Sequence, residues 1–173
     1  EVHQGVDLVP FADLNEKLHV FWPTHADGHT SMFRTGHYAR KFMAMECDDH
    51  FHPVYNSPGD TDVMFLAARL RSAQARGDNR VNVLPSLLER RAELEAIERD
   101  RPAKTAEWLE SMTSLSDKRV FVMGPWMLLY DFAKKGLAAG KKCNFAPNSV
   151  FQTGGGGKGM VVPDDWADVT GRF

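Results

Sequence analysis

A run of glycines followed by a lysine is the segment of this sequence whose residue types could most directly bind a ligand. The segment consists of Gly154, Gly155, Gly156, Gly157 and Lys158. Glycines carry no Cβ atom, so their backbone can approach a flat or anionic group closely, and their N–H groups can bind its oxygen atoms. The apolar run at residues 150–153 predicts a strand directly before the glycines, and open α/β sheets bind ligands at the carboxyl ends of their strands. The segment is therefore a candidate nucleotide-binding loop, and the alternative is a flexible hairpin or linker.

Two common nucleotide motifs were compared with this loop. A Walker A loop requires a glycine where Gln152 stands, and it requires Ser or Thr after the lysine, where this chain has Gly159. The dinucleotide pattern GxGxxG is matched literally by Gly154, Gly156 and Gly159, but the apolar residues 161–162 and a proline follow in place of a helix. Neither motif explains the glycines.

Histidines and aspartates form a second set of candidate ligands. The potential metal ligands are His25, Asp27, His29, His50 and His52. Imidazole and carboxylate groups together suit zinc or non-haem iron, and a metal-bound hydroxide can attack an ester or an amide. The sequence therefore leaves open an alternative function as a metal-dependent hydrolase that uses zinc.

The composition excludes several classes of protein. With 43% hydrophobic and 25% charged residues, the chain has enough apolar material for a core, and its net charge of -2 argues against a nucleic-acid partner. Cys47 and Cys143 form no CxxC pair, so neither a disulfide framework nor a thiolate zinc site is expected. The apolar runs are too short to cross a bilayer. The sequence predicts a soluble, cytoplasmic protein, with no Gly-x-Ser-x-Gly nucleophile motif.

Hydrophobic periodicity and helix-breaking residues predict the elements that must position these groups. Strands are expected at residues 18–22, 119–123 and 150–153, helices at 30–46, 60–77, 85–101, 102–112 and 126–139, and a loop at 48–59. Strand, helix and strand over residues 119–153 predict a parallel βαβ unit. We therefore expect a single α/β domain over residues 1–173, with a parallel or mixed sheet, flanking helices and a helical insertion at about residues 60–115.

Two segments resemble a known enzyme superfamily. Residues 145–159, which contain the glycines, and residues 119–125 upstream are similar to the adenylate-forming superfamily, in particular its branch of acyl-protein synthetases and phenylacetate-CoA-ligase-like enzymes. The resemblance implies that ATP activates a carboxylic acid as an acyl-adenylate, which then passes its acyl group to a thiol acceptor such as CoA or a carrier protein. It also implies that Gly154, Gly155 and Gly156 line the adenine, with Gly157 and Lys158 beside them.

A further segment, at residues 21–29, is similar to the part of these enzymes that lines the acyl pocket. The resemblance implies that His25, Gly28 and His29 contact the carboxylic acid substrate. Other parts of the family pattern are missing. Residues 1–17 do not supply its phosphate loop rich in Ser, Thr and Gly, and neither the Tyr-Gly-x-Thr-Glu element that holds Mg²⁺ nor the small C-terminal domain with its catalytic lysine is present.

We therefore expect this chain to be an incomplete part of the enzyme's N-terminal domain. Its catalytic residues stay unassigned. A non-catalytic nucleotide-binding or interaction remnant is the third alternative, beside the adenylate-forming enzyme and the metal-dependent hydrolase.

Overall fold

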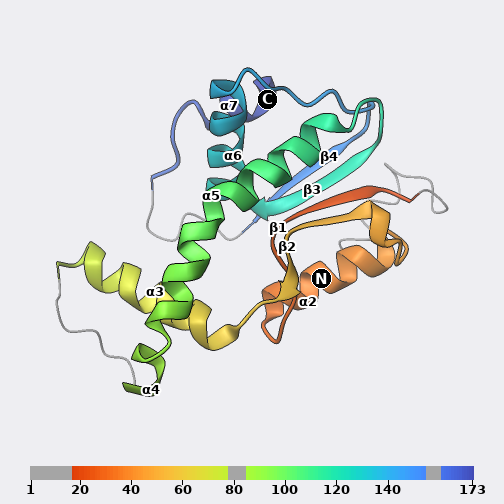
Figure 1. Ribbon diagram of the computed structural model, residues 1–173. Helices are drawn as coiled ribbons and strands as arrows, with labels where there is room; N and C mark the ends of the chain where they lie inside the picture. Colours follow the sequence, from red (N-terminus) through yellow and green to blue (C-terminus); the bar gives the residue numbers. More distant parts are fainter. Residues whose placement is uncertain (1–16, 78–84, 155–160) are drawn as a thin grey trace.

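The structure is a computed structural model that describes residues 17–77, 85–154 and 161–173 of the 173-residue chain. Its centre is a sheet of four parallel strands in the order β2-β1-β3-β4 (Figure 1). The strands are β1 at His19–Asp27, β2 at Phe51–Pro58, β3 at Val120–Pro125 and β4 at Val150–Gly154. The expected α/β class with a parallel sheet and flanking helices is confirmed.

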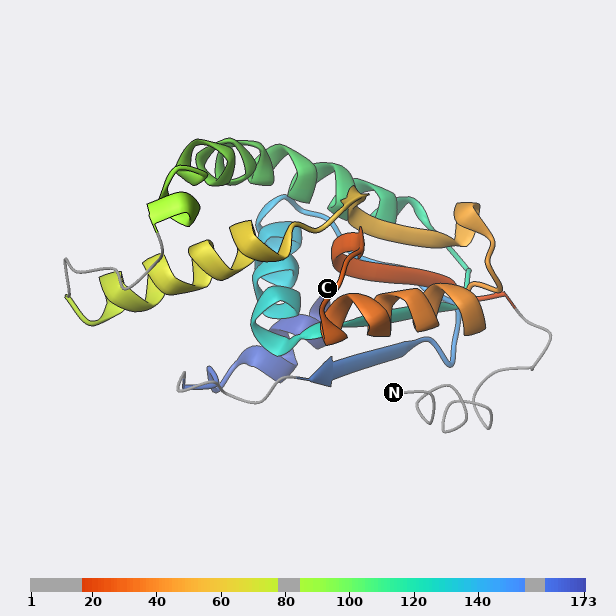
Figure 2. The same ribbon diagram turned by 90° about the horizontal axis from the view of Figure 1, so that it is seen from below.

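Helices connect the strands and cover both faces of the sheet (Figure 2). They are α2 at Ser31–Phe42, α3 at Thr61–Ala75, α4 at Pro85–Leu88, α5 at Arg91–Ser114, α6 at Trp126–Ala138 and α7 at Trp166–Arg172, and a short 3₁₀ helix, η2, lies at Asp48–His50. None of the helices in the described ranges combines the length and the apolar character that crossing a membrane requires.

The two faces follow from the alternation of side chains along each strand. Val20 and Trp22 of β1 pack with Ala39 and Met43 near α2, whereas Phe21 points to the opposite face. There Phe21 belongs to a cluster with buried side chains of α5, α6 and α7, among them Trp108. Because both faces are buried around β3 and the first half of β1, these two segments read as continuous apolar runs, which is typical of parallel sheets.

The loop expected at residues 48–59 is wrong, because residues 51–58 form the strand β2. Pro53 and Pro58 argue against a strand in the sequence, but β2 is the terminal strand of the described sheet and pairs only with β1 there. An edge strand tolerates proline because the missing N–H need not serve a second neighbour.

The division of the helical segment at Pro102 is a second expectation that the structure contradicts. Pro102 was expected to end one helix and begin another, yet α5 continues through it. Pro102 is exposed, so water can hydrate the carbonyl that the proline leaves unbonded one turn earlier. The helix expected at residues 85–101 is interrupted after the four-residue α4, and its remainder from Arg91 belongs to α5.

Two aspartates that precede helices make different hydrogen bonds. Oδ1 of Asp60 accepts hydrogen bonds from the backbone N–H groups of Asp62 and Val63 at 3.0 and 3.1 Å and so caps α3. Asp165 precedes α7, but its side chain makes no cap hydrogen bond and instead accepts one from the Tyr130 hydroxyl at 2.8 Å. Asp165 thus ties α7 to α6.

Candidate functional site

The strand order creates a point where the connections diverge. Along the chain, β2 is added on one side of β1, whereas β3 and β4 lie on its other side. In open α/β sheets, ligands bind outside the carboxyl ends of the strands where the order reverses in this way. Here that point lies between the carboxyl ends of β1 and β3, on the edge of the sheet from which α3 departs (Figure 2).

The first candidate loop starts at this carboxyl edge. Gly154 is the last residue of β4 and pairs with Pro125, the last residue of β3. The chain therefore leaves β4 beside the end of the strand that borders the divergence point. Gly155, Gly156, Gly157 and Lys158 lie outside the described residues, so their role in nucleotide binding stays a prediction.

Pairing between the two strands at the divergence point ends before their carboxyl ends. β1 and β3 pair only from His19 and Val120 to Phe21 and Val122, although both strands continue further. Beyond that point Pro23 packs on Gly124 so closely that a Cβ atom at position 124 would lie 2.6 Å from the proline Cγ. Gly124 is therefore required where the pairing ends.

His25 projects from the carboxyl half of β1 and is half-buried. Its ring stacks on Tyr55 of β2, with centroids 4.5 Å apart, and meets the edge of Phe33 from α2. Its Nδ1 lies 3.2 Å from the carbonyl oxygen of Ser57 and 3.5 Å from the Ser57 hydroxyl. The indole of Trp22 donates a hydrogen bond to the His25 carbonyl at 3.0 Å. These contacts hold the ring in one orientation.

This geometry determines the protonation of His25. A carbonyl oxygen can only accept, so Nδ1 carries the hydrogen that bonds Ser57, and Nε2 is an acceptor. Burial lowers the pKa of His25, while the Ser57 carbonyl opposes that shift. A neutral His25 can accept a proton or a hydrogen bond from a substrate, but it does not supply a positive charge. Because Nδ1 already donates, it does not activate the Ser57 hydroxyl as a nucleophile.

The other predicted residues of this segment have different surroundings. Asp27 is exposed and its carboxylate accepts a hydrogen bond from the Gly28 N–H at 2.7 Å. Gly28 lies against Phe33, whose ring a Cβ atom at that position would strike, so this glycine has a packing role. His29 is exposed just beyond the strand. His25, Gly28 and His29 thus share the carboxyl edge of the sheet, and their contact with a substrate stays a prediction.

His50 and His52 lie toward the opposite end of the strands. His52 pairs with Phe21 near the start of β1, whereas His25 pairs with Tyr55 further along β2. In place of metal ligation, the rings of His50 and His52 stack with that of His19. The structure does not bring the five potential metal ligands together. Among the residues it describes, no group of three or more His, Cys, Asp or Glu side chains is placed to hold a metal ion.

Tyr55 and Ser57 are site residues that the sequence did not indicate. Both belong to β2, whose two prolines led to the expectation of a loop. The buried Phe51 and Val54 are three residues apart, so they do not show the period of two that indicates a strand, and the sequence held little signal for β2. Even with the strand recognised, the pairing of Tyr55 with His25 depends on a register that bulges shift.

The candidate site therefore combines a glycine segment that leaves β4, a divergence point bordered by β1 and β3, and a neutral imidazole at the end of β1. Both cysteines are free, and burial raises the pKa of Cys143 to about 12, so this thiol is not poised as a nucleophile. Comparisons of the chain with protein-family models, curated proteins and solved structures give no match.

Proposed function

We propose that this chain takes part in the ATP-dependent activation of a carboxylic acid as an acyl-adenylate, for transfer to a thiol or another acceptor. The observation that carries the proposal is the departure of the glycine segment from Gly154 at the carboxyl edge of a parallel sheet, next to the divergence point. The resemblance of residues 119–125 and 145–159 to adenylate-forming enzymes supplies the reaction. The proposal also includes the assignment of the chain to the N-terminal domain of such an enzyme.

In the proposed reaction, a carboxylate oxygen attacks the α-phosphorus of ATP and pyrophosphate leaves. A thiol then attacks the acyl carbon, AMP leaves, and the thiol proton passes to a base. The glycine segment would lie against the adenine, where the absence of Cβ atoms permits close contact. His25 would accept a hydrogen bond near the acyl group, with Gly28 and His29 beside it. The described residues hold no group of three or more His, Cys, Asp or Glu side chains placed for a metal ion, and we assign Mg²⁺ no ligand among them.

ATP binding tests the nucleotide part of the proposal. ATP at one hundred times its Kd should stabilise the protein by about 2.7 kcal/mol, seen as a rise in Tm. Gly155→Val should remove this rise without lowering the Tm measured in the absence of ATP. Gly171→Val is the matched control, since a Cβ atom at that position in α7 meets nothing within 4 Å. An ATP effect that persists in Gly155→Val would remove the glycine segment from the site.

Because this chain is proposed to be an incomplete part of the enzyme, the reaction itself is tested on the complete enzyme that contains it, by exchange of labelled pyrophosphate into ATP stimulated by one member of a panel of carboxylic acids. Acid-dependent exchange supports adenylation. Saturable ATP binding without exchange by any acid indicates the non-catalytic nucleotide-binding alternative. Stoichiometric bound zinc, with an esterase or amidase activity that chelation abolishes, would replace the proposal with the metal-dependent hydrolase.

A further inference from the structure

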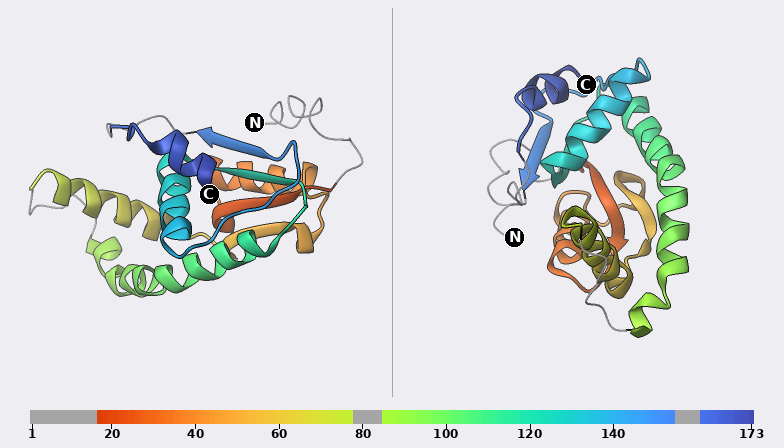
Figure 3. Two further views of the ribbon diagram at one scale, coloured as in Figure 1. Left: turned by 90° about the horizontal axis from the view of Figure 1, so that it is seen from above. Right: turned by 90° about the vertical axis from the view of Figure 1, so that its left-hand side faces the viewer.

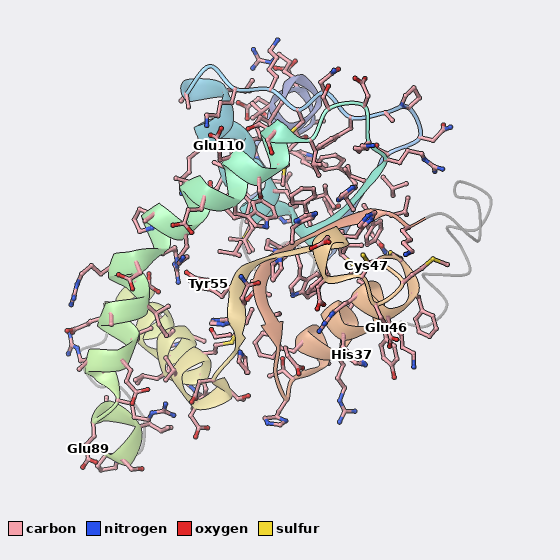
Figure 4. All side chains as sticks on the ribbon, turned by 45° about the vertical axis from the view of Figure 1, so that its right-hand side comes forward. His37, Glu46, Cys47, Tyr55, Glu89 and Glu110 are labelled. Carbon is pink, nitrogen blue, oxygen red and sulfur yellow. The ribbon has the colours of Figure 1, made fainter. Side chains whose placement is uncertain are left out.

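The imidazole ring of His25 is held in place by two aromatic side chains. It stacks on Tyr55, which Figure 4 labels on β2, and it meets the edge of Phe33 from α2. Phe33 is itself fixed, because it is fully buried and a Cβ atom at either Gly28 or Gly59 would strike its ring. The fold therefore sets the direction of the His25 ring before any substrate binds.

The second nitrogen of this ring is an acceptor that a ligand can reach. Because Nδ1 donates to the Ser57 carbonyl, Nε2 carries a lone pair. The hydrogen bond to Ser57 lies at the surface, and no described residue donates a hydrogen bond to Nε2. Nδ1 of His50, in contrast, is a ring nitrogen that is buried without a partner. His25 thus offers one accessible acceptor in a fixed direction.

A carboxylate is a poor partner for this acceptor. The oxygens of an ionised carboxylate only accept hydrogen bonds, and Nε2 of a neutral His25 also only accepts. Asp27, two positions further along β1, adds an exposed negative charge at the same edge of the sheet. The carboxylate of an acid bound in the candidate site therefore points away from His25.

Another part of the acid then meets His25. Figure 3 shows that β1, β2 and β4 end at one edge of the sheet, from which α3 also departs. β1 and β4 lie on either side of β3, so two strand spacings, about 10 Å, separate them. An acid whose carboxylate reaches a nucleotide beside the glycine segment would extend its remaining groups toward β1.

We propose that the acid activated by this enzyme carries a hydroxyl or amino group, which donates a hydrogen bond to Nε2 of His25. The inference rests on the proposed adenylation and names the class of its substrate. His25 is then a residue that determines specificity. A site that hydrogen-bonds one group of its substrate discriminates strongly against analogues without that group, because the polar atom of the site loses its partner.

Matched acids test this inference in the complete enzyme that contains the chain. Both acids of a pair have the same carbon skeleton, and a methyl group in one replaces the hydroxyl or amino group of the other. Pyrophosphate exchange gives kcat/KM for each acid. We expect the donor-bearing acid of the best pair to exceed its methyl analogue at least about tenfold. A methoxy analogue should behave like the methyl analogue, since its oxygen only accepts. Comparison of hydroxyl with amino pairs identifies the donor.

Two variants show whether His25 causes this preference. His25→Phe removes the acceptor and keeps a ring beside Tyr55. It should reduce the preference to about twofold or less, mainly by lowering kcat/KM for the donor-bearing acid. His37→Phe is the matched control, because His37 is an exposed histidine on α2, and it should retain the full preference.

NMR of the ¹⁵N-labelled imidazoles provides a readout that does not depend on activity. In the free protein, His25 should carry a proton on Nδ1 and none on Nε2, and the preferred acid should shift the Nε2 resonance saturably. This measurement keeps the inference testable if His25→Phe does not fold. If no acid stimulates exchange, the proposed adenylation and this inference both fail. Equal use of donor-bearing and methyl acids, an unchanged preference in folded His25→Phe, or a proton on Nε2 overturns this inference alone.

Discussion

Three stacked imidazoles near the amino ends of β1 and β2 couple the stability of this protein to pH. The rings of His19 and His50 stack with centroids 4.1 Å apart, and Nδ1 of His19 lies 3.0 Å from Nε2 of His52. Burial is the main cause that lowers the pKa of His52 to about 4; the charges of His19 and His50 add to it, and Asp49 opposes it. Burial, His50 and Lys118 also lower the pKa of His19. The stack therefore favours neutral rings at His19 and His52.

The sign of the pH dependence follows from His52. The unfolded chain binds a proton at this residue near pH 6.5, whereas the folded protein does so only near pH 4, so acid favours unfolding between these values. We expect His52 to lower the free energy of unfolding by about 1–2 kcal/mol over this interval, a value reduced because the ring is partly exposed. His52→Gln should flatten this part of the profile in urea denaturation.

His37 provides the matched control for this prediction. It lies on the exposed side of α2, where Figure 4 labels it, away from the stack. His37→Gln should retain the full decline of stability between pH 6.5 and 4. If His52→Gln and the unchanged protein lose stability in parallel over that interval, His52 is not the group that senses acid.

At the scale of elements, a glycine determines how closely α2 packs on the sheet. Gly36 lies in α2, and a Cβ atom there would lie 2.7 Å from Cε2 of Trp22 on β1. Alanine normally stabilises a helix relative to glycine by about 1 kcal/mol. Here we expect Gly36→Ala to destabilise the protein by about 1–3 kcal/mol, because the buried Trp22 must move. Thermal and urea denaturation measure the change.

For Gly171, the glycine of α7, we expect substitution by alanine to have the opposite effect on stability. A Cβ atom at Gly171 meets nothing within 4 Å, so Gly171→Ala should stabilise the protein by about 0.5–1 kcal/mol. Equal effects of the two substitutions would mean that the contact of Trp22 with α2 does not limit packing at position 36.

Elements with a strong local pattern were predictable from the sequence. The strands β3 and β4 and the helices α2, α3 and α6 were predicted with small errors at their ends, because apolar periodicity is local information. The strand β1 was predicted only as far as Trp22, because Pro23 was expected to end it, whereas the structure continues it to Asp27. The strand β2 and the continuous helix α5 were not predicted, because each contains a proline that only its position in the fold makes tolerable. Pro53 is tolerated because β2 lies at the edge of the sheet, and Pro102 because the carbonyl it leaves unbonded is exposed to water. Both conditions are properties of the fold and cannot be inferred from the prolines themselves.

The candidate site was predictable to the same extent. The expected strands end before Gly154 and before His25, which places both residues at the carboxyl edge of a parallel sheet, although the structure includes His25 in β1 itself. The neighbours of His25 could not be inferred, because Tyr55 and Ser57 reach it through strand pairing thirty or so residues away along the chain. The separation of His25 from His52 is likewise a consequence of register.

At the scale of the whole molecule, the helices between β2 and β3 form a unit that extends from the sheet (Figure 1). Val63, Leu66, Ala67 and Leu94 make a small cluster between α3 and α5 that is separate from the clusters on the two faces of the sheet. Exposed ion pairs of Arg90 with Asp60 and Glu93 tie this unit together and contribute little to its stability.

This arrangement predicts that α3 and the first half of α5 open before the sheet does. The small cluster depends on Leu66, which is fully buried, and Leu66→Ala should cost about 2–3 kcal/mol. Hydrogen exchange should become faster in α3 and in α5 before Pro102, and it should stay slow in β1 and β3. Val122→Ala, in the cluster under α5 and α6, should instead speed exchange in those strands. If Leu66→Ala lowers the protection of β3 as much as that of α3, the three clusters unfold together, and the helical unit has no stability of its own to lose.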